Sequence, residues 1–489
     1  MFLIYIFLGI YVLAMLFVLF YSFAQAHLLF YFFKFKKNDK GIPPMDGEKL
    51  PFITVQLPIY NEMYVVERLI ESVAALRYPK EKLEIQILDD STDKTSDIIP
   101  QKIKNYPQVN LKYLHRSDRK GFKAGALREG LAKAEGELVA IFDADFVPKP
   151  DFLLKTIPHF EDSRVGMVQS RWTHLNEDYS LLTRLQAFAL DAHFMVEQIG
   201  RNSQGAFINF NGTGGIWRKS CILDAGNWQE DTLTEDLDLS YRAQKKGWSF
   251  IYRADIESPA ELPPVMSAIK SQQFRWTKGG AECAMKHLRS VLGGKFPLTK
   301  KLHAAAHLLN SVIFIAVLLV SISSIPIWWG FYSGLLPQSL YQASGFFFIG
   351  FIIIAMVYFF ANISLVGYSF KGIWRFLWEL PVFLSVSMGL ALHNAQAVWE
   401  GLTGKKSPFV RTPKYNLGLK DSWTENVYNQ LKVPFTTYVE AFLALVFLSM
   451  SIVSIRTGNY TMLVFHLMLA LGYGVVGIAS FRSYAIRRQ

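Results

Sequence analysis

Long runs of apolar residues lie near both ends of the chain. Residues 2–33 contain no Lys, Arg, Asp or Glu, and about 20 such residues are enough to cross a bilayer as a helix. The C-terminal third holds four more apolar runs, at 302–332, 346–370, 433–455 and 460–481. The pattern therefore predicts five transmembrane helices.

Basic residues beside these runs predict their orientation. Lysines follow the first run directly, at Lys34, Lys36, Lys37 and Lys40, and arginines follow the last, at Arg482, Arg487 and Arg488. Positively charged loops stay on the cytoplasmic side of a membrane, so the first helix is expected to start outside. The apolar stretch 373–399 has basic flanks at both ends. We interpret it as a helix on the cytoplasmic face; the alternative is a sixth span, which would place the basic C-terminus outside.

Between the apolar ends, residues 51–265 alternate between strand-like and helix-like patterns. Strands are expected at 52–57, 85–88, 111–114 and 138–142, and helices at 63–76, 95–104 and 122–134. Such alternation is typical of an α/β domain with a mostly parallel sheet and helices on both faces. Ligands bind such sheets at the carboxyl ends of the strands.

Composition and charge narrow the possible functions. The chain has 489 residues, a formal net charge of +11, 51% apolar residues and 15% aromatic residues, which excludes a disordered chain. Its two cysteines, Cys221 and Cys283, exclude a disulfide scaffold and a Cys-based zinc site. Residues 51–269 carry 26 basic and 31 acidic residues, a net of −5, so the rest carries +16. The positive charge is therefore expected to face membrane lipid, and no nucleic acid partner is predicted.

Acidic residues follow two of the predicted strands. Asp143 and Asp145 come directly after the last strand, and two carboxylates in such a turn hold a hard cation such as Mg²⁺ together with substrate phosphates. An ordinary Asp-rich turn is the alternative. Asp89 and Asp90 follow the second strand, where aspartates also serve as turn and cap residues. Lys123 opens a helix, a position that favours phosphate.

Six short motifs occur in the order seen in processive family 2 glycosyltransferases, and the chain resembles this family of cellulose, hyaluronan and chitin synthases. They are PIYNE at 58–62, DDSTD at 89–93, KAGAL at 123–127, DAD at 143–145, TED at 234–236 and QxxRW at 272–276. Within the family, the chain is most similar to the plant cellulose-synthase-like A and C proteins, which make mannan and xyloglucan-type β-1,4 backbones. The stretches that carry this similarity are 85–93, 142–146 and 210–218.

The resemblance implies a cytosolic GT-A domain, with a Rossmann-like α/β fold, joined to an α-helical transmembrane bundle with interfacial helices. The implied order is an N-terminal transmembrane helix at 1–33, the glycosyltransferase domain at 51–265, basic interfacial helices with QxxRW at 266–301, two transmembrane helices at 302–370, an interfacial helix and gating loop at 371–432, and two transmembrane helices with a basic tail at 433–489. The protein is then expected to be integral to a bacterial inner or plasma membrane or to the eukaryotic Golgi membrane.

The same resemblance implies catalytic and donor-binding roles for residues of these motifs. Asp236 resembles the general base that takes a proton from the acceptor hydroxyl, and catalytic roles are also implied for Glu235 and Asp145. Asp143 and Asp145 would hold Mg²⁺ or Mn²⁺ against the donor diphosphate. The residues implied to bind the nucleotide sugar are Pro58, Tyr60, Glu62, Asp89, Asp90, Lys123, Asp143, Gln272 and Arg275.

The resemblance also implies residues for the acceptor. Trp276 would form the floor of the acceptor site, because sugar rings pack onto aromatic faces; a Trp at the membrane interface is the alternative. Asn211, Gly212 and Thr213 match a glycosylation sequon, but their position in the predicted cytosolic domain favours the family's acceptor-side loop. Candidates to line the path of the product through the membrane are Trp217, Trp276, Trp328, Trp329 and Trp399.

A gating loop is expected after the stretch 373–399. Phe409, Thr412 and Lys414 match the family's loop, whereas Arg411 and Tyr415 replace its valine and glycine. The loop would close over the bound nucleotide and exclude water. A group of basic residues that touches anionic lipid is the alternative.

Together these features imply a processive, inverting β-glycosyltransferase. It would polymerise a β-1,4-linked glucan or mannan from cytosolic UDP-glucose or GDP-mannose and pass the growing polysaccharide across the membrane. No residue separates the two donors. A non-processive enzyme that adds one sugar to a lipid, similar to ceramide glucosyltransferase, stays an alternative, as does a transporter or scaffold with a decayed transferase domain.

Overall fold

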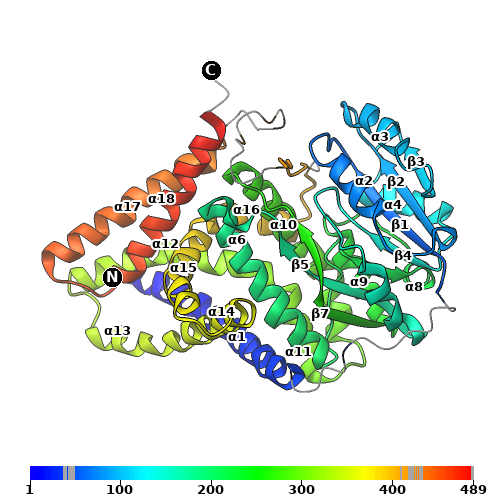
Figure 1. Cartoon of the computed structure of the whole chain (residues 1–489). Coiled ribbons are helices and arrows are strands. Elements are labelled where there is room, and N and C mark those ends of the chain that lie inside the picture. The colour runs from blue at the N-terminus through cyan, green and yellow to red at the C-terminus, as the bar shows by residue number, and fades with distance from the viewer. Residues whose placement is uncertain are drawn as a thin grey trace.

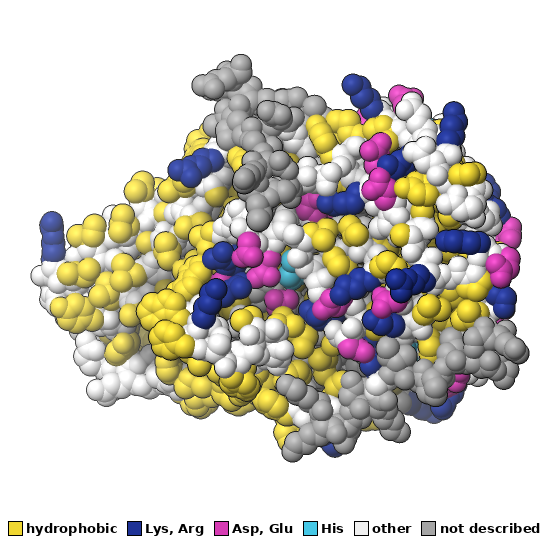
Figure 2. All heavy atoms as spheres, viewed as in Figure 1, with side chains coloured by type: hydrophobic (Ala, Val, Ile, Leu, Met, Phe, Trp, Pro, Cys, Tyr) yellow, Lys and Arg dark blue, Asp and Glu magenta, His cyan; other side chains and the backbone are white. Residues whose placement is uncertain are grey.

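The computed structural model describes residues 1–36, 41, 50–407, 410–416, 423, 426, 428 and 433–485. Two parts lie side by side in it, an α/β domain and a bundle of long helices (Figure 1). Hydrophobic side chains dominate the surface of the bundle, whereas charged side chains of both signs are spread over the α/β domain (Figure 2). The apolar runs of the sequence thus form the helical bundle, and the more polar segment between them forms the α/β domain.

A seven-stranded sheet organises the α/β domain in the described part of the chain. Its strands are β1 (Ile53–Ile59), β2 (Leu83–Asp89), β3 (Leu111–His115), β4 (Leu138–Ile141), β5 (Val165–His174), β6 (Gly215–Arg218) and β7 (Ser249–Ala260), in the spatial order β3-β2-β1-β4-β6-β5-β7. β6 runs antiparallel to its neighbours β4 and β5, and the other pairs are parallel. The predicted α/β fold with a mostly parallel sheet is confirmed. The sequence pattern predicts β1 to β4 but none of the last three strands.

Alternation along the strands gives the sheet two different faces. On one face, Val55 and Ile85 belong to an apolar core with helix α2 (Val66–Ala74). On the other face, buried polar side chains pair across neighbouring strands, as where Thr54 Oγ1 donates to Glu84 Oε2 at 2.6 Å. The parallel pairing of β1 with β2 and β4 brings their carboxyl ends to one edge of the sheet, where ligands are expected.

The helical bundle matches the predicted number of spans. Five stretches of the described residues are long and apolar enough to cross a membrane. They belong to α1 (Phe2–Lys36), α12 (Ile313–Tyr332) with the turn before it, α14 (Phe348–Val366) with the short helices before it, α17 (Phe435–Thr457) and α18 (Leu463–Ala485). α1 packs against α12 and α14, and α17 packs against α18.

The ambiguous stretch 373–399 differs from the single helix that the sequence predicts. It forms two helices, α15 (Phe370–Gly389) and α16 (Ala391–Leu402), which meet at an angle of 50°. Gly389 ends α15 against α18, and a Cβ there would lie 2.3 Å from the carbonyl oxygen of Gly472. This close backbone contact fixes where the helix ends. Counted as one broken span, the pair would be a sixth crossing, and the interfacial location stays a prediction.

Helix α10 (Met266–Leu292), which carries the QxxRW motif, joins the two parts. It packs against α16 and α11 (Leu298–Leu308). Its Lys270 is buried and donates to both carboxylate oxygens of Glu440 on α17, at 2.9 and 2.6 Å. The motif is therefore held between the sheet and the bundle.

Candidate active site

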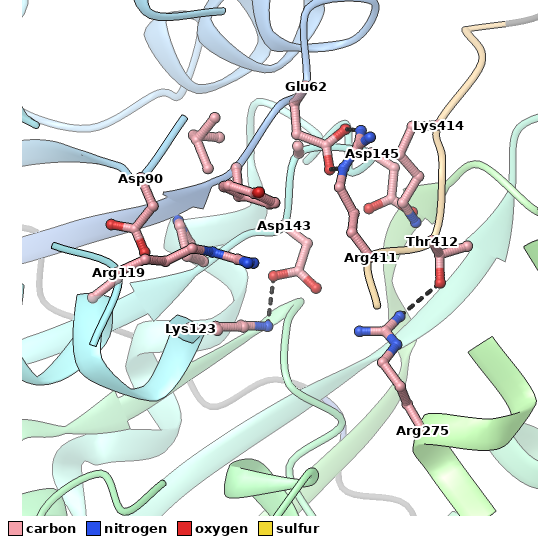
Figure 3. Close-up of a pocket in the computed structure, with 15 residues that line it drawn as sticks. Glu62, Asp90, Arg119, Lys123, Asp143, Asp145, Arg275, Arg411, Thr412 and Lys414 are labelled. Carbon is pink, nitrogen blue, oxygen red and sulfur yellow. Dashed lines mark hydrogen bonds and ion pairs between the residues drawn. The ribbon is translucent and has the colours of Figure 1, made fainter. Parts of the chain in front are cut away.

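A cavity of about 110 Å³ opens at the sheet edge where β1, β2 and β4 end, and it is here called the donor cavity after the predicted donor-binding residues that line it. Figure 3 shows side chains from the strand ends, from α10 and from the loop 410–416 pointing into it. The lining residues are Pro58, Ile59, Tyr60, Glu62, Asp90, Arg119, Lys123, Ala126, Asp143, Ala144, Asp145, Arg275, Arg411, Thr412 and Lys414. The structure thus brings most of the predicted nucleotide-sugar residues together.

A second cavity, here called the acceptor cavity, has a volume of about 130 Å³. It shares Lys123, Asp143, Asp145, Arg275 and Lys414 with the donor cavity. Its lining also includes the predicted residues Asn211, Gly212, Glu235, Asp236, Gln272 and Trp276, and Trp172 and His174, which the sequence analysis missed. Because the cavities share these walls, groups bound in them would meet beside Asp143 and Asp145.

Asp143 and Asp145 occupy the turn that follows β4. The Asp143 N–H donates to Thr213 Oγ1 at 2.9 Å, so Thr213 supports this turn and is not among the residues that line the acceptor cavity. Lys123 Nζ donates to Asp143 Oδ1 at 2.6 Å and to the Gly212 carbonyl at 2.9 Å. Burial would lower the pKa of Lys123, but Asp143 and neighbouring carboxylates outweigh it and raise the pKa. Lys123 is therefore a fixed cation at the boundary of the two cavities.

The two aspartates fit a hard divalent cation by the chemistry of their donor atoms. Both carboxylates line the donor cavity, and Mg²⁺ or Mn²⁺ binds carboxylate oxygen. Among the described residues no group of three or more His, Cys, Asp or Glu side chains is placed to hold a metal. A site of two carboxylates is therefore incomplete by itself, and substrate phosphates are the usual source of further ligands for Mg²⁺.

Tyr60, Asp90 and Arg119 line another part of the donor cavity. Arg119 lies over the ring of Tyr60, with Cζ 3.3 Å from the ring centroid. Arg116 makes two bonds to Asp90, from Nε at 2.7 Å and from Nη2 at 2.6 Å. Arg116 and Arg119 were not predicted as site residues, although both precede Lys123 in the loop after β3, at the carboxyl edge of the sheet.

Asp89 lies beneath this part of the donor cavity and does not line it. Its carboxylate is buried and accepts from the Ser91 N–H at 2.9 Å and from Tyr113 Oη at 2.8 Å. These bonds fix the turn that presents Asp90.

Asp236 lies in the first turn of α9 (Glu235–Lys245) and lines the acceptor cavity. The loop that carries Gly212 passes very close to it. A Cβ at residue 212 would lie 3.1 Å from Asp236 Oδ2 and 3.4 Å from Lys123 Nζ, and the φ of Gly212 is +81°. Glycine therefore allows this loop to approach both the carboxylate and the cation.

Helix α9 is fastened to α10 by a buried carboxylate. Asp238 Oδ1 lies 2.8 Å from Nε2 of His287 on α10, and Asp238 Oδ2 accepts from Arg242 Nε at 2.9 Å. Asp238 has no exposed surface, and these partners hold its pKa well below its usual range even though burial opposes this. The pairing sets the position of Asp236 relative to the QxxRW motif.

The loop 410–416 lies over the donor cavity. Arg275 Nη2 donates to Thr412 Oγ1 at 2.7 Å, and Lys414 donates to Asp145. Thr412 and Lys414 thus line the donor cavity, whereas Phe409 lies outside the described residues, and the gating role stays a prediction.

Arg411 and Tyr415, the two residues that differ from the family's loop, both make contacts. Arg411 pairs with Glu62 through both carboxylate oxygens. Burial raises the pKa of Glu62 to about 7, although Arg411 opposes the rise. The N–H of Tyr415 donates to Glu261 Oε1 at 2.9 Å. Glu261, which follows β7 directly, was not predicted as a site residue. Its position at the end of a strand could have identified it, because ligands bind such sheets at the ends of strands.

The tryptophans proposed to line the product path lie in different parts of the molecule. Trp276 lines the acceptor cavity. Trp217 is wrong as a candidate, because it is fully buried in the core of the α/β domain between Phe210 and Phe250. Trp328 is buried in the bundle, where its Nε1 donates to a serine of α17. The other two, Trp329 and Trp399, are 53% and 65% exposed.

The ionisation of Asp236 predicts how activity depends on pH. Burial, and then the neighbouring Glu235, raise the pKa of Asp236 to about 7. If Asp236 is the general base that the resemblance implies, it must be deprotonated to act, so activity should rise with pH through about 7, and the rate at pH 6 should be about a tenth of its plateau. The check is a profile of kcat/KM for the acceptor between pH 5.5 and 8.5. A flat profile from pH 6 to 8 would contradict the assignment.

Comparison with known proteins agrees with the family resemblance of the sequence and with the fold. Residues 51–279 match the family described as "Glycosyltransferase like family 2". The chain is 40% identical over 305 residues to probable glucomannan 4-beta-mannosyltransferase 4 of Oryza sativa subsp. japonica, which covers 58% of this chain and 56% of the relative. It is 42% identical over 265 residues to glucomannan 4-beta-mannosyltransferase 1 of Cyamopsis tetragonoloba, which covers 53% and 50%. The chain thus spans about half the length of the curated relatives it matches.

A solved structure shares the fold. The mannosyltransferase PcManGT from Pyrobaculum calidifontis, in complex with GDP-Man and Mn²⁺, superposes with a TM-score of 0.54 at 19% sequence identity, over 80% of this chain and 100% of that chain. The resemblance to family 2 glycosyltransferases is therefore confirmed: residues 51–279 match that family's model, and the curated relatives named above are glucomannan mannosyltransferases.

Proposed function

We propose that the protein is a processive, inverting β-glycosyltransferase that makes a β-1,4-linked polysaccharide from a cytosolic nucleotide sugar and passes it across the membrane. The observation that carries this proposal is the meeting of the two cavities. The carboxylates Asp143 and Asp145 and the cations Lys123 and Arg275 line both, and the carboxylate of Asp236 faces them from the acceptor cavity. UDP-glucose and GDP-mannose are the candidate donors, and the names of the relatives favour mannose as the sugar.

The residues divide the chemistry of one transfer. Asp236 takes the proton from the acceptor hydroxyl, whose oxygen forms the new bond to C1 of the donor sugar as the bond from C1 to the diphosphate breaks. Lys123 and Arg275 hold the leaving diphosphate. Asp143 and Asp145 would hold Mg²⁺ or Mn²⁺, which supplies Lewis-acid stabilisation of that leaving group when bound. Attack from the side opposite the leaving group turns an α-linked donor into a β-linked product.

Two larger cavities support a path for a polymer. Their volumes are about 230 and 490 Å³, and both have Gln273 and Trp276 in their walls. They lie between the α/β domain and the bundle, and Trp276 also lines the acceptor cavity. Their walls are largely apolar, with separate polar groups such as Asn394. A pyranose ring, with apolar faces and hydroxyl edges, fits such a surface.

Asn394 is expected to bind a hydroxyl of the glycan. It is fully buried, lines the smaller of these cavities, and neither amide atom has a partner among the described residues. Replacing it with leucine should remove about 0.5–1.5 kcal/mol of glycan binding. Products should become shorter, while the rate of the first transfer changes less than about twofold. The measurement is the length distribution of radiolabelled product.

Asn362 on α14 offers a matched control. It is also buried, with an amide oxygen that has no partner in the described part of the chain, but it does not line either cavity. Asn362→Leu should leave product length unchanged. If Asn394→Leu gives products of wild-type length, this path for the glycan is wrong.

The proposed function is tested with purified full-length protein in lipid. Separate reactions receive radiolabelled UDP-glucose or GDP-mannose, and the product is extracted with organic solvent before linkage analysis. Polymeric label with β-1,4 linkages supports the synthase. Label that extracts into solvent supports a single transfer to lipid instead, and the absence of transfer from either donor contradicts both.

A further inference from the structure

The loop 410–416 places cationic side chains against the acidic residues of the donor cavity. Arg411 pairs with Glu62, and Lys414 pairs with Asp145. In Figure 3, Arg411 and Lys414 reach into the cavity from the loop, on the side opposite Arg119. The side chains of Lys414 and Asp145 are only 14% and 7% exposed, so water screens this pair little.

Both carboxylates of the candidate metal pair are therefore already bound by ammonium groups. Lys123 Nζ is 2.6 Å from Asp143 Oδ1, and Lys414 donates to Asp145. A divalent cation at the pair would have to displace at least one of them. Lys123 is held on its other side by the Gly212 carbonyl, whereas Lys414 comes from a loop, so Lys414 is the cation that can be replaced with less rearrangement of the α/β domain.

The net charge of the cavity also disfavours binding of a divalent cation without the donor. Its walls carry five cations, Arg119, Lys123, Arg275, Arg411 and Lys414, and four carboxylates, Glu62, Asp90, Asp143 and Asp145. A divalent cation that enters alone adds two positive charges to a wall that is already net positive. A diphosphate donor brings about two negative charges, so cation and donor together leave the net charge almost unchanged.

We propose that Lys414 is a built-in competitor for the divalent cation at Asp145, so that the cation binds tightly only together with the nucleoside-diphosphate donor. The inference rests on the proposed function for the identity of that donor class. Arg411 holds the same loop in place through Glu62. When a diphosphate enters, it offers Lys414 a new anionic partner and releases Asp145 to the metal. Coupling between binding sites is reciprocal, so the cation should strengthen donor binding by the same factor.

The test measures Mn²⁺ binding directly, by the electron paramagnetic resonance signal of free Mn²⁺ in titrations of the full-length protein in lipid nanodiscs. Titrations are run without nucleotide and with saturating UDP or GDP. Wild-type protein should bind Mn²⁺ about 5- to 150-fold more tightly with the matching nucleotide, the usual range of coupling between sites. In Lys414→Gln, binding without nucleotide should strengthen and the coupling factor should shrink.

Two further variants separate competition from general charge effects. Lys414→Arg keeps a cation beside Asp145 and should bind Mn²⁺ as weakly as the wild type without nucleotide. Lys155→Gln removes a partly exposed lysine that pairs with Asp151 elsewhere on the domain, and it should leave Mn²⁺ binding unchanged. Equal Mn²⁺ affinity of wild type and Lys414→Gln without nucleotide would overturn the inference, as would wild-type affinity that no nucleotide changes.

Failure of this inference is distinguishable from failure of the proposed function. If Lys414→Gln does not change Mn²⁺ binding but the wild type makes a β-1,4 polymer, the competition is wrong and the synthase stands. If nucleotide-coupled Mn²⁺ binding depends on Lys414 but labelled sugar reaches only a lipid, the competition stands and the synthase is wrong.

Discussion

Replacing Asp236 with asparagine is expected to lower the turnover number by about 10²- to 10⁴-fold, the range that a positioned general base contributes. Asparagine retains the size of the side chain and an oxygen to accept from the Leu237 N–H, which Asp236 Oδ1 now accepts at 2.8 Å. It cannot take a proton from the acceptor. Because Asp236 lines the acceptor cavity and not the donor cavity, KM for the donor should change little. Initial rates of sugar transfer over a range of donor concentrations measure both values.

Asp97 provides the control for this substitution. It is an exposed aspartate in the first turn of α3 (Thr95–Ile103), so Asp97→Asn removes the same charge from the same kind of helix position away from both cavities. Its turnover should match the wild type. Turnover of Asp236→Asn within about threefold of the wild type would show that Asp236 is not the base.

The parts of the fold that follow from local patterns were predictable. The strands β1 to β4 are short apolar segments separated by helices, and β1, β2 and β3 lie next to one another in the sheet. β6 has only four residues, and β7 pairs with β5 across more than 70 residues of sequence. These strands form because they pair with distant segments. The alternation of apolar and polar residues within a single segment does not reveal such partners. The bend after α15 has the same kind of cause, since Gly389 ends that helix against Gly472.

The candidate site shows the same division between local and distant causes. Asp143, Asp145 and Lys123 lie at strand ends or helix starts, where fold and chemistry predict them directly. The pairing of Arg411 with Glu62 joins residues 349 positions apart. No spacing in the sequence indicates such a contact, and the family's loop gave valine as the expected residue. The contact forms because the loop 410–416 lies over the donor cavity.

Loss of the Arg275 side chain is expected to be the other severe defect. Arg275 is half-buried, lines both cavities and lies near Asp143 and Asp145. Burial lowers its pKa, but those carboxylates oppose the shift, and a guanidinium stays charged at neutral pH. Arg275→Ala should lower kcat/KM for the donor by about 10²- to 10³-fold, as for the removal of one donor to a developing anion. Inhibition by the nucleoside diphosphate product should weaken with it, because that product carries the charge that Arg275 contacts.

A conservative variant and a control on the same helix make this prediction specific. Arg275→Lys retains the charge but not the planar pair of N–H groups, so it should recover only part of the lost activity. Arg289, exposed in the last turn of α10, is the control, and Arg289→Ala should behave as the wild type. If Arg275→Ala loses turnover but binds the nucleoside diphosphate as tightly as the wild type, then Arg275 does not hold the leaving group. Its bond to Thr412 would then be the contact that matters, and Thr412→Val should reproduce the defect.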